Sequence, residues 1–224
     1  AFDVTVVGSG GTVTVTNDVG GNINIGQSAV ANAITSAVVS GGLAVAVRDR
    51  SGTAAATGSK LTSVSIDGNA GAATLTGDGI TSVTIGDTNQ NATITAAAGT
   101  RTLGLTVNTV TGGVITDATA TTVNVTSTGA ANTVADLAVA AATAVTLGGD
   151  KALTLTTTHL GAATGLTVAG SALTTVSGYN TTNKLATVTV TGAGGFTSDL
   201  SGQGTQVGTC HGRVLRPPWA EIGR

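Results

Sequence analysis

A short phrase recurs along the chain and limits what it can fold into. Thr62-Ser63-Val64-Ser65-Ile66-Asp67-Gly68 returns at 81–87, and shortened forms stand at 121–125 and 143–150. Each copy alternates polar and β-branched residues and then enters a Gly/Asp turn, which is typical of a half-buried β-strand. A repeated strand unit predicts a repeat architecture, because one copy alone cannot bury its apolar face.

The spacing of the repeat predicts an all-β chain that forms a β-solenoid (parallel β-helix). Centres of the main phrase fall near positions 64, 83, 105, 123, 145, 167 and 188, and a second apolar series falls between them at Leu75, Ile94, Ile115, Val134, Leu155 and Val176. Two strands per coil of about twenty residues suit a solenoid. A β-sandwich is the alternative, since strands every 8–12 residues also suit that fold. Recurrence at alternate positions and the lack of bulky residues favour the solenoid.

The repeat is clearest over residues 60–192, and strand patterns at 4–7, 12–16 and 22–25 extend the predicted body to 1–202. Residues 28–39 fit either a short Ala-rich helix capped by Ser28 or a pair of strands. The run Arg48-Asp49-Arg50 is interpreted as an exposed turn. Residues 203–224 contain the only Cys, the only Trp and both prolines, so we interpret them as a non-native, vector-derived or flexible tail; a genuine docking tail is the alternative.

Composition excludes several classes of function. Threonine makes up about a fifth of the chain, and charged residues are 9%, well below the average domain. A net charge of -2 and 2% aromatic residues argue against nucleic acid, which needs a basic surface and stacking platforms. No apolar run approaches the ~20 residues that a transmembrane helix requires. The single Cys210 leaves no internal disulfide framework.

No catalytic motif is present, and the sequence predicts a protein that is not an enzyme. His159 is the only histidine in the repeat region, with Asp150, Ser171 and Ser177 nearby in sequence. A Ser-His-Asp triad needs these groups in mutual reach, and no G-x-S-x-G elbow supports one. Polysaccharide-active solenoids rely on carboxylates and aromatic platforms. Since aromatics are so scarce here, this class remains a weak alternative.

Five aspartates follow predicted strands and are candidate calcium ligands: Asp67, Asp78, Asp87, Asp117 and Asp150. Calcium takes oxygen ligands from carboxylates and turn carbonyls. Stacked coils would bring turn aspartates together, and a cation would relieve their repulsion. Asp is also simply a good turn residue, and this second interpretation stays open.

Threonine pairs in Thr-x-Thr spacing would lie on one face of a strand, as at 12–16, 74–76, 93–95, 154–156 and 187–191. β-propensity is the simpler explanation of these residues. An ice-binding solenoid is an alternative, because a flat array of threonines could order water.

The run 142–155 continues through 158–168 as strand, Gly/Asp, strand and a Leu-Thr-x-Val phrase. Together with its surroundings at 119–191 it resembles bacterial surface-layer (S-layer) proteins of the Caulobacter type and their RTX-secreted relatives. The resemblance implies an extracellular structural protein of the bacterial surface that assembles with itself in a calcium-dependent lattice, with cell-surface polysaccharide as a further partner. The RTX nonapeptide is absent, so a spacer or passenger region of a large secreted adhesin is the alternative.

Overall fold

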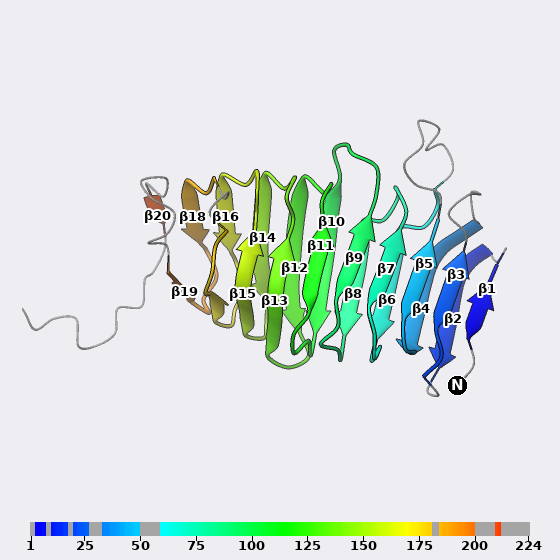
Figure 1. Cartoon of the computed structure of the whole chain (residues 1–224). Helices are drawn as coiled ribbons and strands as arrows, with labels where there is room; N and C mark the ends of the chain where they lie inside the picture. Colours follow the sequence, from blue (N-terminus) through cyan, green and yellow to red (C-terminus); the bar gives the residue numbers. More distant parts are fainter. Residues whose placement is uncertain are drawn as a thin grey trace, which may run out of the picture.

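The chain forms two long parallel β-sheets that face each other, as shown by a computed structural model of the 224 residues (Figure 1). The structure describes residues 3–7, 10–17, 20–26, 33–49, 59–180 and 184–199, and the backbone of 209–211. All the regular elements in this part of the chain are strands. The predicted all-β class is therefore confirmed.

Odd-numbered strands form one sheet and even-numbered strands form the other, each with ten strands. The odd sheet contains β1 (Val4–Val6), β3 (Ile23–Gly26), β5 (Val45–Arg48), β7 (Ala73–Thr76), β9 (Ala92–Thr95), β11 (Val114–Asp117), β13 (Asn132–Ala138), β15 (Leu153–His159), β17 (Thr174–Val176) and β19 (Phe196–Ser198). The even sheet contains β2 (Gly10–Asn17), β4 (Ala33–Gly41), β6 (Ser63–Asp67), β8 (Ser82–Gly86), β10 (Thr102–Asn108), β12 (Thr122–Thr128), β14 (Ala144–Gly149), β16 (Gly165–Val168), β18 (Thr187–Val190) and β20 (Thr209–His211).

Each coil contributes one strand to each sheet, and equivalent strands of successive coils pair in parallel. Val64 of β6 lies beside Val83 of β8, which lies beside Leu105 of β10. Strands that follow one another in the chain lie in different sheets, so the chain winds like a spring. This pairing confirms the predicted β-solenoid, and the β-sandwich alternative is wrong.

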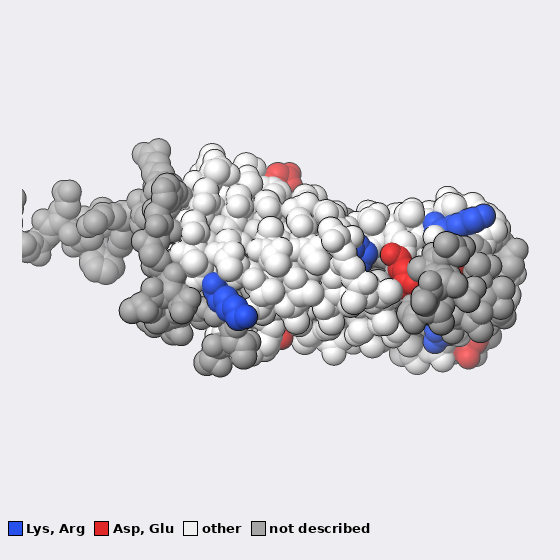
Figure 2. All heavy atoms as spheres, turned by 90° about the horizontal axis from the view of Figure 1, so that it is seen from above, with Lys and Arg blue, Asp and Glu red and all other residues white. Residues whose placement is uncertain are grey.

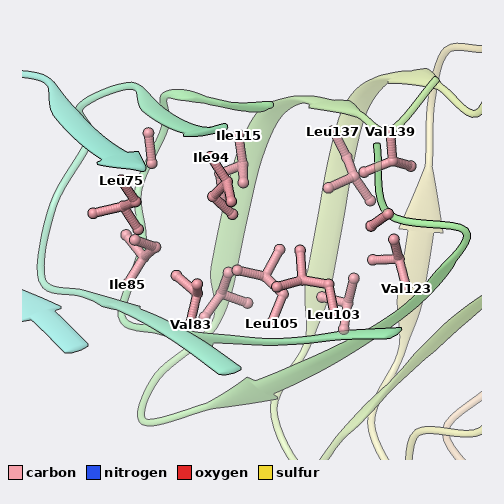
Figure 3. Packing of buried hydrophobic residues seen from close by; sticks show 14 of the residues in the cluster. Leu75, Val83, Ile85, Ile94, Leu103, Leu105, Ile115, Val123, Leu137 and Val139 are labelled. Carbon is pink, nitrogen blue, oxygen red and sulfur yellow. The ribbon is translucent and has the colours of Figure 1, made fainter. Parts of the chain in front are cut away.

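The core is a narrow layer of aliphatic side chains between the sheets. Leu75 and Ile94 of the odd sheet meet Val83, Ile85 and Leu105 of the even sheet (Figure 3). All five are at most 3% exposed, and the outward residues between them are polar or small. Burying a Val, Leu or Ile side chain contributes roughly 1.5–3 kcal/mol. A repeated ladder of such residues can therefore replace the bulky anchors of a globular core.

The odd sheet changes shape in its second half. In β13 and β15 two consecutive outward residues interrupt the alternation, Ala135–Asp136 and Thr156–Thr157, and their pairing register skips the same position. Because both strands make this break at the same position, their pairing offset stays at 21 residues on either side of it. Seen from above, the body is broader toward its C-terminal end, on the left of Figure 2.

The structure decides one open alternative and corrects one prediction. Residues 33–41, part of the segment that could have been a helix, form strand β4, because its residues complete the even sheet between β2 and β6; residues 28–32 lie outside the described part. Asp49, predicted in an exposed turn, is fully buried because Ser59 Oγ and the amides of Lys60 and Leu61 donate to its carboxylate. In the segment interpreted as a tail, β20 pairs with β18.

Candidate functional site

The solenoid has two turn-bearing edges, and the five candidate aspartates divide between them. We call the edge where even strands end the even-to-odd edge, and the edge where odd strands end the odd-to-even edge. Asp67 ends β6, Asp87 follows β8 and Asp150 follows β14, so these three lie at the even-to-odd edge. Asp78 follows β7 and Asp117 ends β11, at the odd-to-even edge.

Asp67 and Asp87 are the candidates that the fold brings together. Asp67 pairs with Gly86, directly before Asp87, and both carboxylates are exposed. A Cβ atom on Gly86 would collide with Asp67 Oδ1, so the carboxylate of Asp67 lies over the neighbouring coil. The two turns carry carboxylates on adjacent coils, and hard cations prefer oxygen ligands of this kind.

Backbone carbonyls complete the surroundings of this pair. The amide of Gly68 donates to Gly86 O at 3.0 Å, and the amide of Asp87 donates to Asn108 O at 2.9 Å. Within the described residues, no group of three or more His, Cys, Asp or Glu side chains converges here or elsewhere. A cation at this edge would therefore need carbonyl and water ligands beside the two carboxylates.

Asp150 lies three coils further along the same edge. Its carboxylate pairs with Lys151 Nζ at 3.1 Å, and both side chains are largely exposed. It is therefore separated from Asp67 and Asp87, and it already has a cationic neighbour.

At the opposite edge, Asp78 and Asp117 serve the backbone. Asp78 Oδ1 accepts a hydrogen bond from Ala97 N of the next coil at 2.6 Å. Asp117 Oδ1 accepts from the amides of Thr119 and Ala120, at 3.0 and 2.9 Å. Asp49 plays the same part in an earlier coil. These carboxylates fix the turns that lead from odd strands to even strands.

Asp117 also forms a buried ion pair with Arg101. Arg101 Nη2 lies 2.6 Å from Oδ1 and 2.5 Å from Oδ2, and the side chains are 7% and 0% exposed. Arg101 Nη1 donates to Ile80 O, while its Nε is buried without a partner among the described residues. Because Asp117 is occupied by a guanidinium and two amides, it is a poor calcium ligand.

An open groove lies beside this ion pair, under the loop that rises between β9 and β10 (Figure 1). Its volume is about 520 Å³, and its lining consists of Asp78, Gly79, Thr81 and residues 97–102. Apart from Asp78 and Arg101, which are engaged as described, the lining offers only threonine hydroxyls and backbone. The groove places no nucleophile beside a general base.

His159 has a different partner from those considered from the sequence. Its Nδ1 lies 2.8 Å from Asp136 Oδ2 of the preceding coil, on the outer surface of the odd sheet. Asp150 lies at the end of an even strand, in the other sheet. The sequence did not indicate Asp136 as the partner, because it lies 23 residues from His159 and pairs with Thr157, two positions before it.

Arg101 and Asp49 were also missed as interacting residues. Arg101 is the only charged residue between Asp87 and Asp117 in a chain that is only 9% charged. An isolated basic residue less than one coil before an isolated acidic one was a usable signal for a buried pair.

No family model, curated protein or solved structure matches this chain. No helix long and apolar enough to cross a bilayer occurs in the described residues.

Proposed function

We propose that this chain is a structural segment of a bacterial cell-surface layer, extracellular and assembling with copies of itself. The observation that carries the proposal is the uninterrupted stacking of coils in two parallel sheets. Such a body is rigid and elongated, and it presents long flat faces over which repeated weak contacts can add up. The S-layer resemblance of residues 142–168 supports the same function.

The surface composition also supports a structural role. Figure 2 shows few charged side chains over the middle of the body, and most atoms there belong to uncharged residues. Short hydroxyl side chains lose little rotamer entropy on contact, so they suit extended packing surfaces. The groove beside Arg101 is open, and its lining brings no nucleophile together with a general base.

Calcium dependence is the finer part of the proposal, and it rests on the turn pair Asp67 and Asp87. Their carboxylates and the nearby carbonyls offer hard oxygen ligands, whereas Asp117 is occupied by Arg101. A bound calcium ion would supply positive charge between two adjacent coils. The pair would then hold a turn in one arrangement and present it to a neighbouring molecule.

Assembly with and without calcium tests this proposal. The purified chain is followed by light scattering and negative-stain electron microscopy in calcium chloride and in EGTA. We expect ordered sheets or filaments in calcium and their loss in EGTA. A folded monomer under both conditions would overturn the lattice and favour the adhesin spacer.

Variants assign the effect to the turn pair. Asp67→Asn with Asp87→Asn removes both charges at little cost in shape, and we expect it to abolish calcium-dependent assembly. Asp150→Asn at the same edge is the matched control, because Asp150 pairs with Lys151. Equal behaviour of the two variants would contradict the assignment of calcium to Asp67 and Asp87.

A further inference from the structure

The outer surface of the even sheet carries columns of hydroxyl side chains in continuous register. Ser65, Thr84, Thr106 and Thr126 lie side by side on β6, β8, β10 and β12. We call the outward-facing residues of β6 to β18 the hydroxyl face. Its members with hydroxyl or amide groups are Ser63, Ser65, Ser82, Thr84, Thr102, Thr106, Asn108, Thr122, Asn124, Thr126, Thr128, Thr146, Thr167, Thr187 and Thr189.

A second column runs over the other half of the same face. Asn124 pairs with Thr146, Thr146 with Thr167, and Thr167 with Thr189. Glycines stand at Gly104 and Gly148, between members of the columns, and keep the surface low. The two columns together extend the hydroxyl pattern across seven strands.

The hydroxyl face is nearly uncharged. Asp67, at the rim, is the only Asp, Glu, Lys or Arg in the strands of the even sheet. The odd sheet differs, since it carries Arg48 and the Asp136–His159 pair, and its in-out alternation breaks in β13 and β15. Regular alternation from β6 to β18 and neutrality therefore distinguish this part of the even sheet from the odd sheet.

Apart from Thr128, whose hydroxyl donates to Val107 O at 3.4 Å, the threonine hydroxyls of this face make no hydrogen bond within the described part of the protein. None of its hydrogen bonds involves the side chains of Thr84, Thr106 or Thr126. By contrast, the hydroxyls of Thr62, Thr121 and Thr143 at the strand starts donate to backbone carbonyls of the preceding coil. The groups on the hydroxyl face are left to bind water.

The register sets the geometry of that water. Parallel strands lie about 4.7–4.9 Å apart, and outward residues along a strand repeat every ~6.6 Å. Threonine is stiff at χ1, so its hydroxyl and methyl groups keep fixed directions. A rigid solenoid thus holds donors, acceptors and methyl groups on a two-dimensional lattice, with no charge to disorder the hydration layer.

We propose that the hydroxyl face binds ice. The surface of an ice crystal is a rigid, uncharged lattice of hydrogen-bonding groups, and the groups of the hydroxyl face have a comparable spacing. A polysaccharide partner is less well matched, because sugar-binding platforms need aromatic rings. The two aromatic residues in the described part of the chain are Tyr179 and Phe196, and both lie in the odd sheet. The activity is separate from calcium-dependent assembly.

Ice affinity and thermal hysteresis test the proposal. A fluorescently labelled chain in EGTA is offered to a growing ice crystal, and the freezing gap is measured by nanolitre osmometry. We expect the protein to enter the ice and to open a measurable gap. Exclusion from the ice with no gap overturns the proposal, whatever the chain binds otherwise.

Matched variants locate the surface. Thr126→Lys places a long charged side chain in the middle of the hydroxyl face, and Thr167→Lys does so in the second column. Each is expected to lose most of the hysteresis while keeping the circular dichroism spectrum of the parent. Thr93→Lys, on an exposed position of β9 in the odd sheet, is expected to keep it. Equal losses from all three variants would overturn the assignment to the even sheet.

Discussion

At the scale of single residues, the buried pair of Arg101 and Asp117 is the most demanding feature of the core. Removing one partner of such a pair leaves an uncompensated buried charge, which costs about 3–5 kcal/mol. We therefore expect Asp117→Leu to lower the urea midpoint sharply. The double variant Arg101→Met with Asp117→Leu removes both charges and is expected to recover most of that loss. A double variant as unstable as the single one would show that the turn amides bound by Asp117 matter more than the charge.

A second residue-scale feature is the strained backbone at the even-to-odd edge. Gly68 and Gly129 take left-handed conformations after β6 and β12, with φ of 68° and 72°. Asp87 and Thr109 occupy the equivalent positions after β8 and β10, with φ of 43° and 61°. A left-handed backbone costs a non-glycine residue roughly 1–2 kcal/mol, and a β-branched residue is an outlier there.

We expect Thr109→Asn to stabilise the protein, by up to about 1 kcal/mol, because asparagine tolerates the left-handed region. The readout is the urea midpoint of the variant against the parent. Thr111→Asn, two residues on and without positive φ, is the control and is expected to have little effect. A lower midpoint for Thr109→Asn would mean that the contact between Thr109 Oγ1 and Asn108 Oδ1 outweighs the strain.

At the scale of the strand, the recurring phrase has a structural reason for its first threonine. In several coils the residue before the even strand is a threonine at the odd-to-even edge, and its hydroxyl reaches the carbonyl of the equivalent residue one coil earlier. Thr62 Oγ1 donates to Thr35 O, Thr121 Oγ1 to Arg101 O, and Thr143 Oγ1 to Thr121 O. In these coils the first threonine of the phrase therefore bonds to the coil before it.

This ladder can be tested one step at a time. Thr121→Val keeps the shape and the β-propensity and removes the hydroxyl, which also accepts from Arg101 N at 3.1 Å. We expect a loss of about 1 kcal/mol in the free energy of unfolding. Thr126→Val, in the strand β12 that Thr121 precedes, removes a hydroxyl with no hydrogen bond in the described structure and is expected to be neutral. Equal midpoints for the two variants would remove the ladder as a source of stability.

The strand scale also shows what the sequence could predict. Alternation and recurrence were enough for the strands and the solenoid, because those signals come from burial on one face. The register was harder, because it depends on strands that change length. β6 and β8 have five residues each, whereas β10 and β12 have seven, and Leu105 pairs with Val125 and not with the phrase centre Val123.

Charged residues were the hardest part to predict. The apolar pattern predicts Ile115 as the neighbour of Ile94 in the next coil. In the structure that neighbour is the buried Asp117, two residues later, and Ile115 pairs with Ala92. Asp67 and Asp87 could be placed together because both follow copies of one phrase. Asp136 and His159 could not, because their contact depends on a break in the alternation that places Asp136 on the outer surface.

At the scale of the whole molecule, nearly all contacts join a coil to its immediate neighbours. The stability of such a body is close to a sum over coils and their interfaces. If a deletion begins and ends at equivalent positions of successive coils, the strands on either side of it should therefore still pair with each other. Ala144 pairs with Gly165, so residues 144–164 make up one coil whose removal joins two equivalent points.

We expect deletion of 144–164 to give a folded solenoid, one coil shorter. β16 then takes the place of β14 beside β12, and β17 takes the place of β15 beside β13, so inward residues such as Leu166 and Val176 still face the core. Circular dichroism should keep its β-sheet form, and small-angle scattering should show a shorter rod of unchanged thickness. Deletion of 144–153 is the control: it removes half a coil, joins an even-strand start to an odd strand and is expected to unfold the C-terminal half. If both deletions behaved alike, stability would come from the ends of the body and not from the coil-by-coil register.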